Sequence, residues 1–375
     1  MLVGKICLTG GPCAGKTTAL SAIEQNLQEQ GYNVLIVSES ATELIKGGIK
    51  PFGKNCVDIL LFQDLIMNYQ LNKEMIYENA ANSLDGKTVI IYDRGVMDNK
   101  AYMTNRQFKQ ILNRNKLNEL SLMDNYDMVI HLVTAADGKE EFYTLENNEA
   151  RSETVEQAKE LDKKTLNAWV GHRNLKIIDN STDFETKIRR VTNEINNLLG
   201  NPISIKKERK YLIDLNKSNL DILKNYNYTT INIEQTYLNY NKGNCEKRLR
   251  KRMLNNDITY YLTVQRKNES VNKIVVDKKI SEKEYLRLNN YYDDNAAISK
   301  KRFSFIYDKQ YFRLDVFQDD NLAILEIEPA GDKKEIIIPN ELCVIKEITN
   351  DKEYNNYSLA VSKQNTKHTK KYKVA

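Results

Sequence analysis

The sequence has no closely paired cysteines and no long apolar run. Its five cysteines, in 375 residues, form no C-x-x-C pair, which argues against a disulfide framework and against a zinc site. No apolar run approaches the roughly 20 residues needed to cross a bilayer, and the N-terminus leads at once into a strand-like run, without room for a signal peptide. We therefore expect a soluble cytoplasmic protein with free thiols.

The sequence also lacks a large excess of one charge. Lys and Arg number 56 against 51 Asp and Glu, a net charge of +5, which hints only weakly at an anionic partner although basic residues gather in the second half and in the tail from Lys367 to Lys373. Hydrophobic residues make up 41% and charged residues 29%, as in globular proteins. The length predicts two domains rather than one.

The most specific motif lies near the N-terminus, where Gly-x4-Gly-Lys-Thr joins an apolar run to a helix-forming stretch. Its glycines let successive backbone N–H groups turn toward phosphates, and the helix presents its positive end there. Lys16 should reach the β- and γ-phosphates, and Thr17 should bind Mg²⁺. A chance match would not bring both flanking elements. We therefore predict binding of ATP or GTP with Mg²⁺ by Gly10, Gly11, Pro12, Cys13, Ala14, Gly15, Lys16, Thr17 and Thr18.

Five short apolar runs alternate with helical patterns in the first 200 residues. This βαβ order predicts a parallel sheet that is buried on both faces by helices. Sheets of this kind bind ligands at the carboxyl ends of their strands. We therefore expect an α/β P-loop NTPase fold with strands at residues 2–9, 34–38, 89–92, 128–133 and 175–178.

Three further residues are candidates for catalysis. Asp93 ends the third run and should support Mg²⁺, unless it merely ends a strand at the surface. Glu39 follows the second run and could accept a proton from an attacking hydroxyl or clamp the acceptor, although Ser38-Glu39-Ser40 also reads as a helix start. Arg151 lies in a segment that could close over the phosphates as a lid, with a solvated charged helix as the alternative.

The P-loop, the run Asp93-Arg94-Gly95 and residues 149–172 resemble the P-loop kinase-like ATPases grouped with nicotinamide-riboside and deoxynucleoside kinases. The resemblance covers about residues 1–200 and implies that Glu39 binds the acceptor and Arg151 the phosphates. Gln63 and His172 fall in similar stretches, but a lone histidine in a helical segment is more often structural. A guanine-specific Asn-Lys-x-Asp motif is lacking, as is an adenine-specific one, so the base preference stays open.

A second pattern begins after Gly200-Asn201-Pro202, where period-two runs alternate with Asn-rich turns. Eight strand-like runs predict an antiparallel barrel. The expected organisation is a domain of residues 1–200, a second domain of residues 203–360 and a basic tail of residues 361–375. The eight runs cover residues 205–214, 228–238, 245–252, 259–267, 273–280, 301–307, 311–317 and 322–328.

Charged residues gather on one face of these runs, because alternate side chains of a strand point to the same side. From the residues alone, a solvent-facing surface opposite a core is the simplest interpretation. However, residues 208–212, 233–238 and 325–328, with the pair Arg248 and Arg250, resemble the CYTH or triphosphate tunnel family. The resemblance implies an α+β eight-stranded tunnel barrel in which Glu326 and Glu328 bind a divalent metal. Its phosphate-binding residues would be Lys210, Arg248, Arg250, Lys267, Arg302 and Arg313.

The sequence departs from that family at two acidic positions. Lys206 stands where the first glutamate of Glu-x-Glu-x-Lys belongs, and Val275 replaces an acid near Asp277. Fewer carboxylates leave a more positive interior, which is better suited to holding an anion than to activating a water through a metal. We therefore predict a binding or weakly catalytic tunnel.

The two domains in this order resemble a family of ATP/GTP-binding proteins that includes the eukaryotic TRPL-translocation-defect protein, which implies nucleotide binding and phosphoinositide recognition. Two functions remain open. One is a Mg²⁺-dependent phosphotransferase or NTPase that acts on a small-molecule acceptor. The other is a nucleotide-gated protein that binds phosphoinositide or polyphosphate with slow hydrolysis, and it would extend the cytoplasmic location to the membrane periphery. Nucleic acid is not expected, because the tyrosines follow a compositional bias.

Overall fold

The computed structural model of the chain describes residues 1–143, 154–200, 208–238, 245–266, 273–292, 295–317, 321–329 and 335–372. Contacts between Cα atoms divide the chain into two compact units. The first unit comprises Met1–Lys207 with the short segments Asp308–Tyr311 and Pro329–Ile336, and the second comprises Glu208–Tyr307, Phe312–Glu328 and Ile337–Ala375. No helix within the described ranges is long and apolar enough to cross a membrane.

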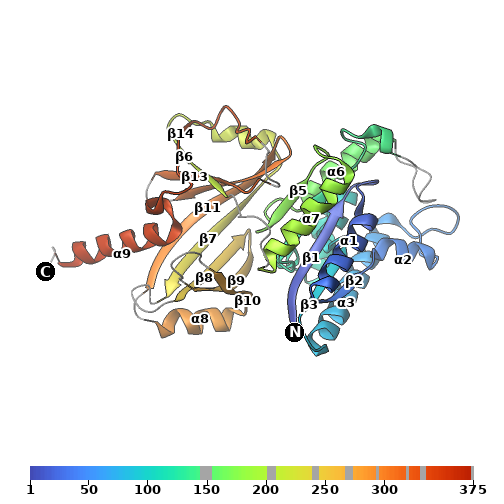
Figure 1. Ribbon diagram of the computed structural model, residues 1–375, viewed down its shortest axis with the longest axis horizontal. Helices are drawn as coiled ribbons and strands as arrows, with labels where there is room; N and C mark the ends of the chain where they lie inside the picture. Colours follow the sequence, from blue (N-terminus) through green and yellow to red (C-terminus); the bar gives the residue numbers. More distant parts are fainter. Residues whose placement is uncertain are drawn as a thin grey trace. The chain divides into compact units, whose positions relative to one another are not determined.

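The first unit is built on a five-stranded parallel sheet in the order β2-β3-β1-β4-β5 (Figure 1). The predicted α/β class and its five strands are confirmed. Central strands β3 and β4 and the C-terminal half of β1 are almost wholly buried because helices cover both faces. The strands span Leu2–Gly10 (β1), Asn33–Val37 (β2), Thr88–Asp93 (β3), Met128–Leu132 (β4) and Leu175–Ile178 (β5).

Helices α1 and α7 pack together on one face of this sheet, where Ile6, Leu8, Val89 and Ile91 meet the apolar sides of both helices. Helices α3 and α6 contact strands of the same sheet. The elements are α1 (Lys16–Glu29), α2 (Ser40–Lys46), α3 (Ile59–Ser83), η1 (Val96–Tyr102), α4 (Asn105–Asn115), α5 (Glu119–Met123), η2 (Glu140–Phe142), α6 (Val155–Ala168) and α7 (Phe184–Leu198).

The second unit is built on an antiparallel sheet in the order β10-β9-β8-β7-β11-β12-β13-β6-β14. Its nine strands exceed the eight that the sequence predicted. The strands span Arg209–Ile213 (β6), Tyr228–Leu238 (β7), Cys245–Leu254 (β8), Asp257–Arg266 (β9), Lys273–Ile280 (β10), Asn295–Tyr307 (β11), Gln310–Phe317 (β12), Leu322–Ile327 (β13) and Val344–Glu347 (β14).

The additional strand, β14, pairs with β6. All four of its residues are exposed, so it lacks the alternation of buried and exposed residues by which a strand is recognised in a sequence. Strand β11 also begins six residues before the predicted run, which brings Lys300 into the sheet. The remaining elements are η3 (Leu220–Asn225), α8 (Glu282–Tyr291), η4 (Lys352–Tyr354) and α9 (Asn356–Tyr372).

Candidate functional site

The P-loop runs from the end of β1 at Gly10 to the start of α1 at Lys16. Gly15 adopts a left-handed φ of 87° at the N-terminus of α1, a conformation that favours glycine. At Gly11, a Cβ atom would lie 2.7 Å from Oδ1 of Asp162, so a side chain there would clash. No described side chain caps α1, and its first turn holds no acidic residue. The free N–H groups and the helix dipole therefore form an anion-binding end.

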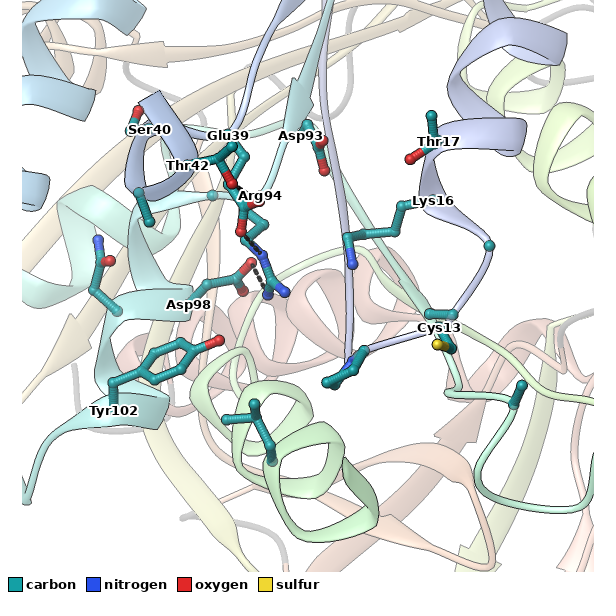
Figure 2. A pocket seen from close by; sticks show the side chains of 18 of the residues that line it. Cys13, Lys16, Thr17, Glu39, Ser40, Thr42, Asp93, Arg94, Asp98 and Tyr102 are labelled. Carbon is teal, nitrogen blue, oxygen red and sulfur yellow. Dashed lines mark hydrogen bonds and ion pairs between the residues drawn. The ribbon is translucent and has the colours of Figure 1, made fainter. Parts of the chain in front are cut away.

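A cavity of about 1060 Å³ lies beside this loop (Figure 2). The predicted residues Pro12 to Thr18, Glu39 and Asp93 all line it, so the fold brings together residues from the ends of β1, β2 and β3. The lining also includes Phe62, Gln63 and Tyr102. Gly10 and Gly11 form the start of the loop, where their carbonyl oxygens each lie 3.3 Å from Nζ of Lys16. Arg151 lies outside the described residues.

Lys16, Thr17 and Asp93 surround one space in the cavity (Figure 2). Burial, with a contribution from Arg94, lowers the pKa of Lys16 to about 8. Burial also raises the pKa of Asp93, and its Oδ1 is buried without a hydrogen-bond partner among the described residues. A buried carboxylate oxygen without a partner is energetically costly, so a cation or a bound water would stabilise it.

These residues fit a magnesium ion that is brought in by a nucleotide. Mg²⁺ usually takes one or two protein ligands and completes its shell with water and phosphate oxygens. The Thr17 hydroxyl and the Asp93 carboxylate are ligands of that kind. Within the described ranges no group of three or more His, Cys, Asp or Glu side chains could hold a metal, so an ion here would depend on the phosphates for most of its ligands.

Glu39 forms an ion pair with Arg94, whose Nε lies 2.5 Å from Glu39 Oε1. Glu39 occupies the N-cap position of α2, but its side chain makes no capping hydrogen bond to the backbone. Burial alone would raise the pKa of Glu39. The charges of Arg94 and Lys16 outweigh this effect and lower the pKa to about 2. A carboxylate that is so strongly held in its ionised form is a weak proton acceptor. The ion pair therefore favours a binding role for Glu39.

Sequence reasoning missed Asp98, a second buried carboxylate that lines the cavity. Asp98 is 2% exposed, and its Oδ1 accepts hydrogen bonds from Thr9 Oγ1 at 2.7 Å and from Trp169 Nε1 at 2.6 Å. Nη1 of Arg94 lies 3.7 Å from Asp98 Oδ2. Because these partners come from β1, β3 and the end of α6, no local pattern in the sequence marked Asp98.

Sequence reasoning also missed Asp162, which supports the P-loop from α6. Its Oδ1 accepts hydrogen bonds from the backbone N of Gly11 at 2.6 Å and of Thr134 at 3.3 Å. The ring of His131 lies 3.2 Å from the same oxygen. A signal for this residue does exist, because Asp162 shares the buried side of the predicted helix with Ala158 and Leu166. A charged residue among buried positions needs a polar partner.

The two remaining sequence candidates have different surroundings. His172 is fully buried, and its ring nitrogens lie 2.9 Å from the carbonyl oxygen of Tyr126 and 3.0 Å from the backbone N of Asn174, which is a structural environment. Gln63 is also buried but lines the cavity. Its Oε1 is without a hydrogen-bond partner in the described part of the chain, so it offers an acceptor to a ligand.

In the second unit, the charged face is buried rather than exposed to solvent. Side chains of Lys300 and Asp315 are 2% and 1% exposed, and their charged atoms lie 2.5 Å apart. Arg302 bridges Asp315 at 2.6 Å and Glu326 at 2.9 Å. These positions alternate along β11, β12 and β13. The solvent-facing alternative is therefore wrong for these residues.

Some of the candidate phosphate-binding and metal-binding residues of this unit form ion pairs with one another, whereas others lie beside residues of the same charge. Glu326 also pairs with Lys210 at 3.2 Å, and Arg313 lies 3.3 Å from Glu328. Arg248, Arg250 and Arg252 instead follow one another at alternate positions of β8. Lys267 and Lys206 lie outside the described residues, and only the backbone is described at Val275.

The fold and the loop define the first unit as a P-loop domain of the α/β NTPase class. The family model AAA_28, an AAA domain, matches residues 5–187, which supports nucleotide or phosphate binding by this part of the chain. No curated protein matches the chain.

Two similar solved structures cover 42% of this chain. They are the inorganic triphosphatase NE1496, with 24% identity, 96% of its own chain covered and a TM-score of 0.32, and the hypothetical protein NE1496, with 23% identity, 98% covered and a TM-score of 0.31.

Proposed function

We propose that the first unit binds Mg²⁺ with ATP or GTP and moves the terminal phosphoryl group to a small-molecule acceptor or to water. The observation that carries this proposal is the meeting of Lys16, Thr17 and Asp93 beside the uncapped start of α1, around one large cavity. Phosphoryl transfer depends mainly on positioning the reactants and on stabilising the charge of the phosphates. The site has residues suited to each of these tasks.

Each residue has a defined part in this proposal. The P-loop amides and Lys16 hold the β- and γ-phosphates, and Thr17 and Asp93 would hold Mg²⁺, which neutralises the phosphate charge. Glu39, kept ionised by Arg94, accepts a hydrogen bond from the acceptor and orients it. Gln63 offers a further acceptor atom in the cavity wall. We also keep the assignment of Arg151 to the transferred phosphoryl group as part of the proposal.

In the second unit, we propose that the buried basic residues hold a phosphate-bearing anion. Buried arginines need anions to offset the loss of hydration, and this sheet carries several arginines on one face. The motif resemblance to triphosphate tunnels supports the same ligand class. Phosphoinositide headgroups and free polyphosphate both fall within it.

The alternative function is a nucleotide-gated binding protein with slow hydrolysis. The pKa of Glu39, at about 2, favours this alternative, because it removes the most obvious base from the first unit. The two functions differ in whether an acceptor accelerates turnover.

Turnover with an acceptor panel tests the proposal. Release of ADP or GDP would be measured with Mg²⁺ in the presence of nucleosides, pyridine ribosides or inositol phospholipids, with Lys16→Ala as the inactive variant and the exposed Lys109→Ala as its control. At least tenfold stimulation by one acceptor, lost in Lys16→Ala and kept in Lys109→Ala, is the expected result. Tight nucleotide binding without stimulation by any acceptor would contradict transfer and favour the gated binding protein.

A further inference from the structure

The charged residues on one face of the second unit's sheet separate into two groups. The first, here called the paired cluster, contains four basic residues and four acidic residues that are joined by ion pairs of 2.5 to 3.3 Å. Equal numbers of both signs make this cluster neutral. Its members are Lys210, Lys300, Arg302, Arg313, Glu208, Asp315, Glu326 and Glu328.

The second group, here called the arginine row, consists of Arg248, Arg250 and Arg252 on β8. Alternate positions place all three side chains on one face of the strand. Arg252 is 3% exposed, and Arg248 and Arg250 are partly buried. Burial and the neighbouring Arg248 lower the pKa of Arg250 to about 9, while Asp277 on β10 offsets part of this effect. The row therefore brings three positive charges together on one partly buried face.

The two groups lie on the same face of the sheet. Gln235 on β7 pairs with Arg250 on β8 and with Ile298 on β11. Because alternate residues of a strand share a face, Arg302 lies on the same side as the arginine row. Arg248 contributes a donor to this face, since its Nε is buried and makes no hydrogen bond within the described ranges. A buried guanidinium donor without an acceptor is costly and fits phosphate oxygens well.

The paired cluster does not fit a divalent metal. Both carboxylate oxygens of Asp315 face a cation, Lys300 on one side and Arg302 on the other, at 2.5 and 2.6 Å. Both carboxylate oxygens of Glu326 also face a cation, Arg302 at 2.9 Å and Lys210 at 3.2 Å. A metal at either carboxylate would have to displace two buried cations and leave them unpaired beside it. Groups of three metal-binding side chains are also absent from the described ranges.

From this geometry we propose that the second unit binds an oligophosphate anion on the arginine row without a divalent metal. The carboxylates that the tunnel resemblance assigns to a metal are instead neutralised by the protein's own lysine and arginine side chains. The ligand supplies a phosphate acceptor for the buried Nε of Arg248 and negative charge beside Arg250, and it needs at least two phosphate groups to span alternate positions of the strand. This inference rests on the proposed anion-binding role of the second unit.

Binding of tripolyphosphate, measured by titration calorimetry with full-length protein, tests the inference. All variants carry Lys16→Ala, which suppresses phosphate binding at the P-loop. The titrations would be run once in EDTA and once in Mg²⁺. Binding in EDTA that is not strengthened by Mg²⁺ is the expected result, since the anion contacts guanidinium groups directly.

Charge variants on one strand locate the site. Arg250→Ala should weaken binding about 10- to 100-fold, the usual effect of losing a charge-assisted hydrogen bond. Lys251→Ala is the matched control, because Lys251 is the next residue of β8 and pairs with Glu234 on β7. It should change affinity less than threefold. Arg250→Lys, which keeps the charge, serves if the alanine variant fails to fold, and should weaken binding by a smaller factor.

Glu326→Gln distinguishes binding of the anion through a metal from direct binding by the arginine side chains. If a metal at Glu326 bridged the anion, this variant would weaken binding in Mg²⁺. Under the present inference it removes one negative charge from the paired cluster and should leave affinity unchanged or increase it. A requirement for Mg²⁺, or a loss of affinity by Glu326→Gln that occurs in Mg²⁺ and not in EDTA, would overturn the metal-free inference while leaving the anion site intact. Failure to bind tripolyphosphate in either buffer would overturn both the inference and the proposed role of the second unit.

Vesicle pelleting separates the two sources of the phosphate groups. Vesicles with a bisphosphorylated phosphoinositide would be compared with phosphatidylserine vesicles of the same net charge. Selective pelleting by the phosphoinositide, reversed by free tripolyphosphate and weakened by Arg250→Ala, assigns the arginine row to a lipid headgroup. Equal pelleting by both vesicles, together with calorimetric binding of tripolyphosphate, assigns it to a free polyphosphate.

Discussion

Arg94 donates from Nε to Oε1 of Glu39 at 2.5 Å, and this ion pair joins the end of β3 to the start of α2 at the cavity wall (Figure 2). The backbone at Arg94 has a φ of 70°, a left-handed conformation that costs energy outside glycine. Its backbone N–H is bonded to the carbonyl oxygen of Leu8 at 2.9 Å. The neighbouring strand β1 therefore fixes the backbone of Arg94, while Glu39 and Asp98 hold its guanidinium.

Replacing Glu39 with Gln should separate acceptor binding from nucleotide binding. The amide keeps the shape of the side chain but breaks the ion pair with Arg94, so acceptor-stimulated turnover should fall about 10- to 100-fold. Nucleotide affinity should change less than threefold. Turnover and fluorescent-nucleotide titration measure the two effects, with the exposed Glu29→Gln as control. Unchanged turnover would remove Glu39 from the site.

Nucleotide affinity should depend on the protonation of Lys16. Burial, aided by Arg94, lowers the pKa of this amine to about 8, so the ligand-free protein loses the charge as the pH rises above about 8. Phosphates favour the charged form. Binding above that pH should therefore take up a proton, and affinity should fall by up to about tenfold per pH unit.

Titration calorimetry between pH 7 and 9.5, in buffers with different ionisation heats, measures this proton uptake. Thr17→Ala, which keeps Lys16, should retain the same dependence at lower affinity. A flat affinity profile over this range would show that Lys16 keeps its charge throughout.

The support of the P-loop by Asp162 predicts a stability defect. Asp162→Ala removes the acceptor of the Gly11 N–H group, which lies 2.6 Å from Oδ1, and a buried donor without a partner costs about 1–3 kcal/mol. The variant should unfold at lower urea concentration and bind nucleotide more weakly. Asp162→Asn keeps an oxygen acceptor and should restore most of both losses. Equal losses in both variants would mean that the negative charge, rather than the hydrogen bond, is what stabilises the loop.

Breaking the buried ion pairs of the second unit should be costly. Asp315→Asn leaves Lys300 and Arg302 without their shared carboxylate, and uncompensated buried charges typically cost about 3–5 kcal/mol. The exposed pair of Arg209 and Glu347, on β6 and β14, offers a control. Glu347→Gln should cost less than about 1 kcal/mol. Urea unfolding measures both, and similar losses in the two variants would contradict the burial of the charged face.

The parts of the fold that could be predicted depend on local patterns. The P-loop is a continuous motif, and the five parallel strands are apolar runs whose character is visible without their partners. Asp98 depends instead on Thr9 and Trp169, which are 89 and 71 positions away, and Asp162 on Gly11, which is 151 positions away. Strand β14 is exposed throughout, and only its pairing with β6 identifies it.

The pattern of charged residues did not decide whether the charged face of the second unit is buried or exposed to solvent. Alternation along the second half correctly placed the charged residues on one face, but alternation is the same for a solvent-facing side and a buried one. The difference comes from the approach of Lys300, Arg302, Asp315 and Glu326 across three strands, which no single strand encodes. Lys300 lay outside every predicted run because the start of β11 was placed too late.

Nucleotide binding by Lys16→Ala tests the central claim most directly. Fluorescent ATP and GTP analogues would be titrated with Mg²⁺ into the wild-type protein, Lys16→Ala and the surface control Lys109→Ala. We predict saturable binding of at least one nucleotide by the wild-type protein and by Lys109→Ala, and binding about 10- to 100-fold weaker in Lys16→Ala, because the phosphates lose a charged hydrogen bond. Equal affinity of the wild-type protein and a correctly folded Lys16→Ala would contradict nucleotide binding at the P-loop.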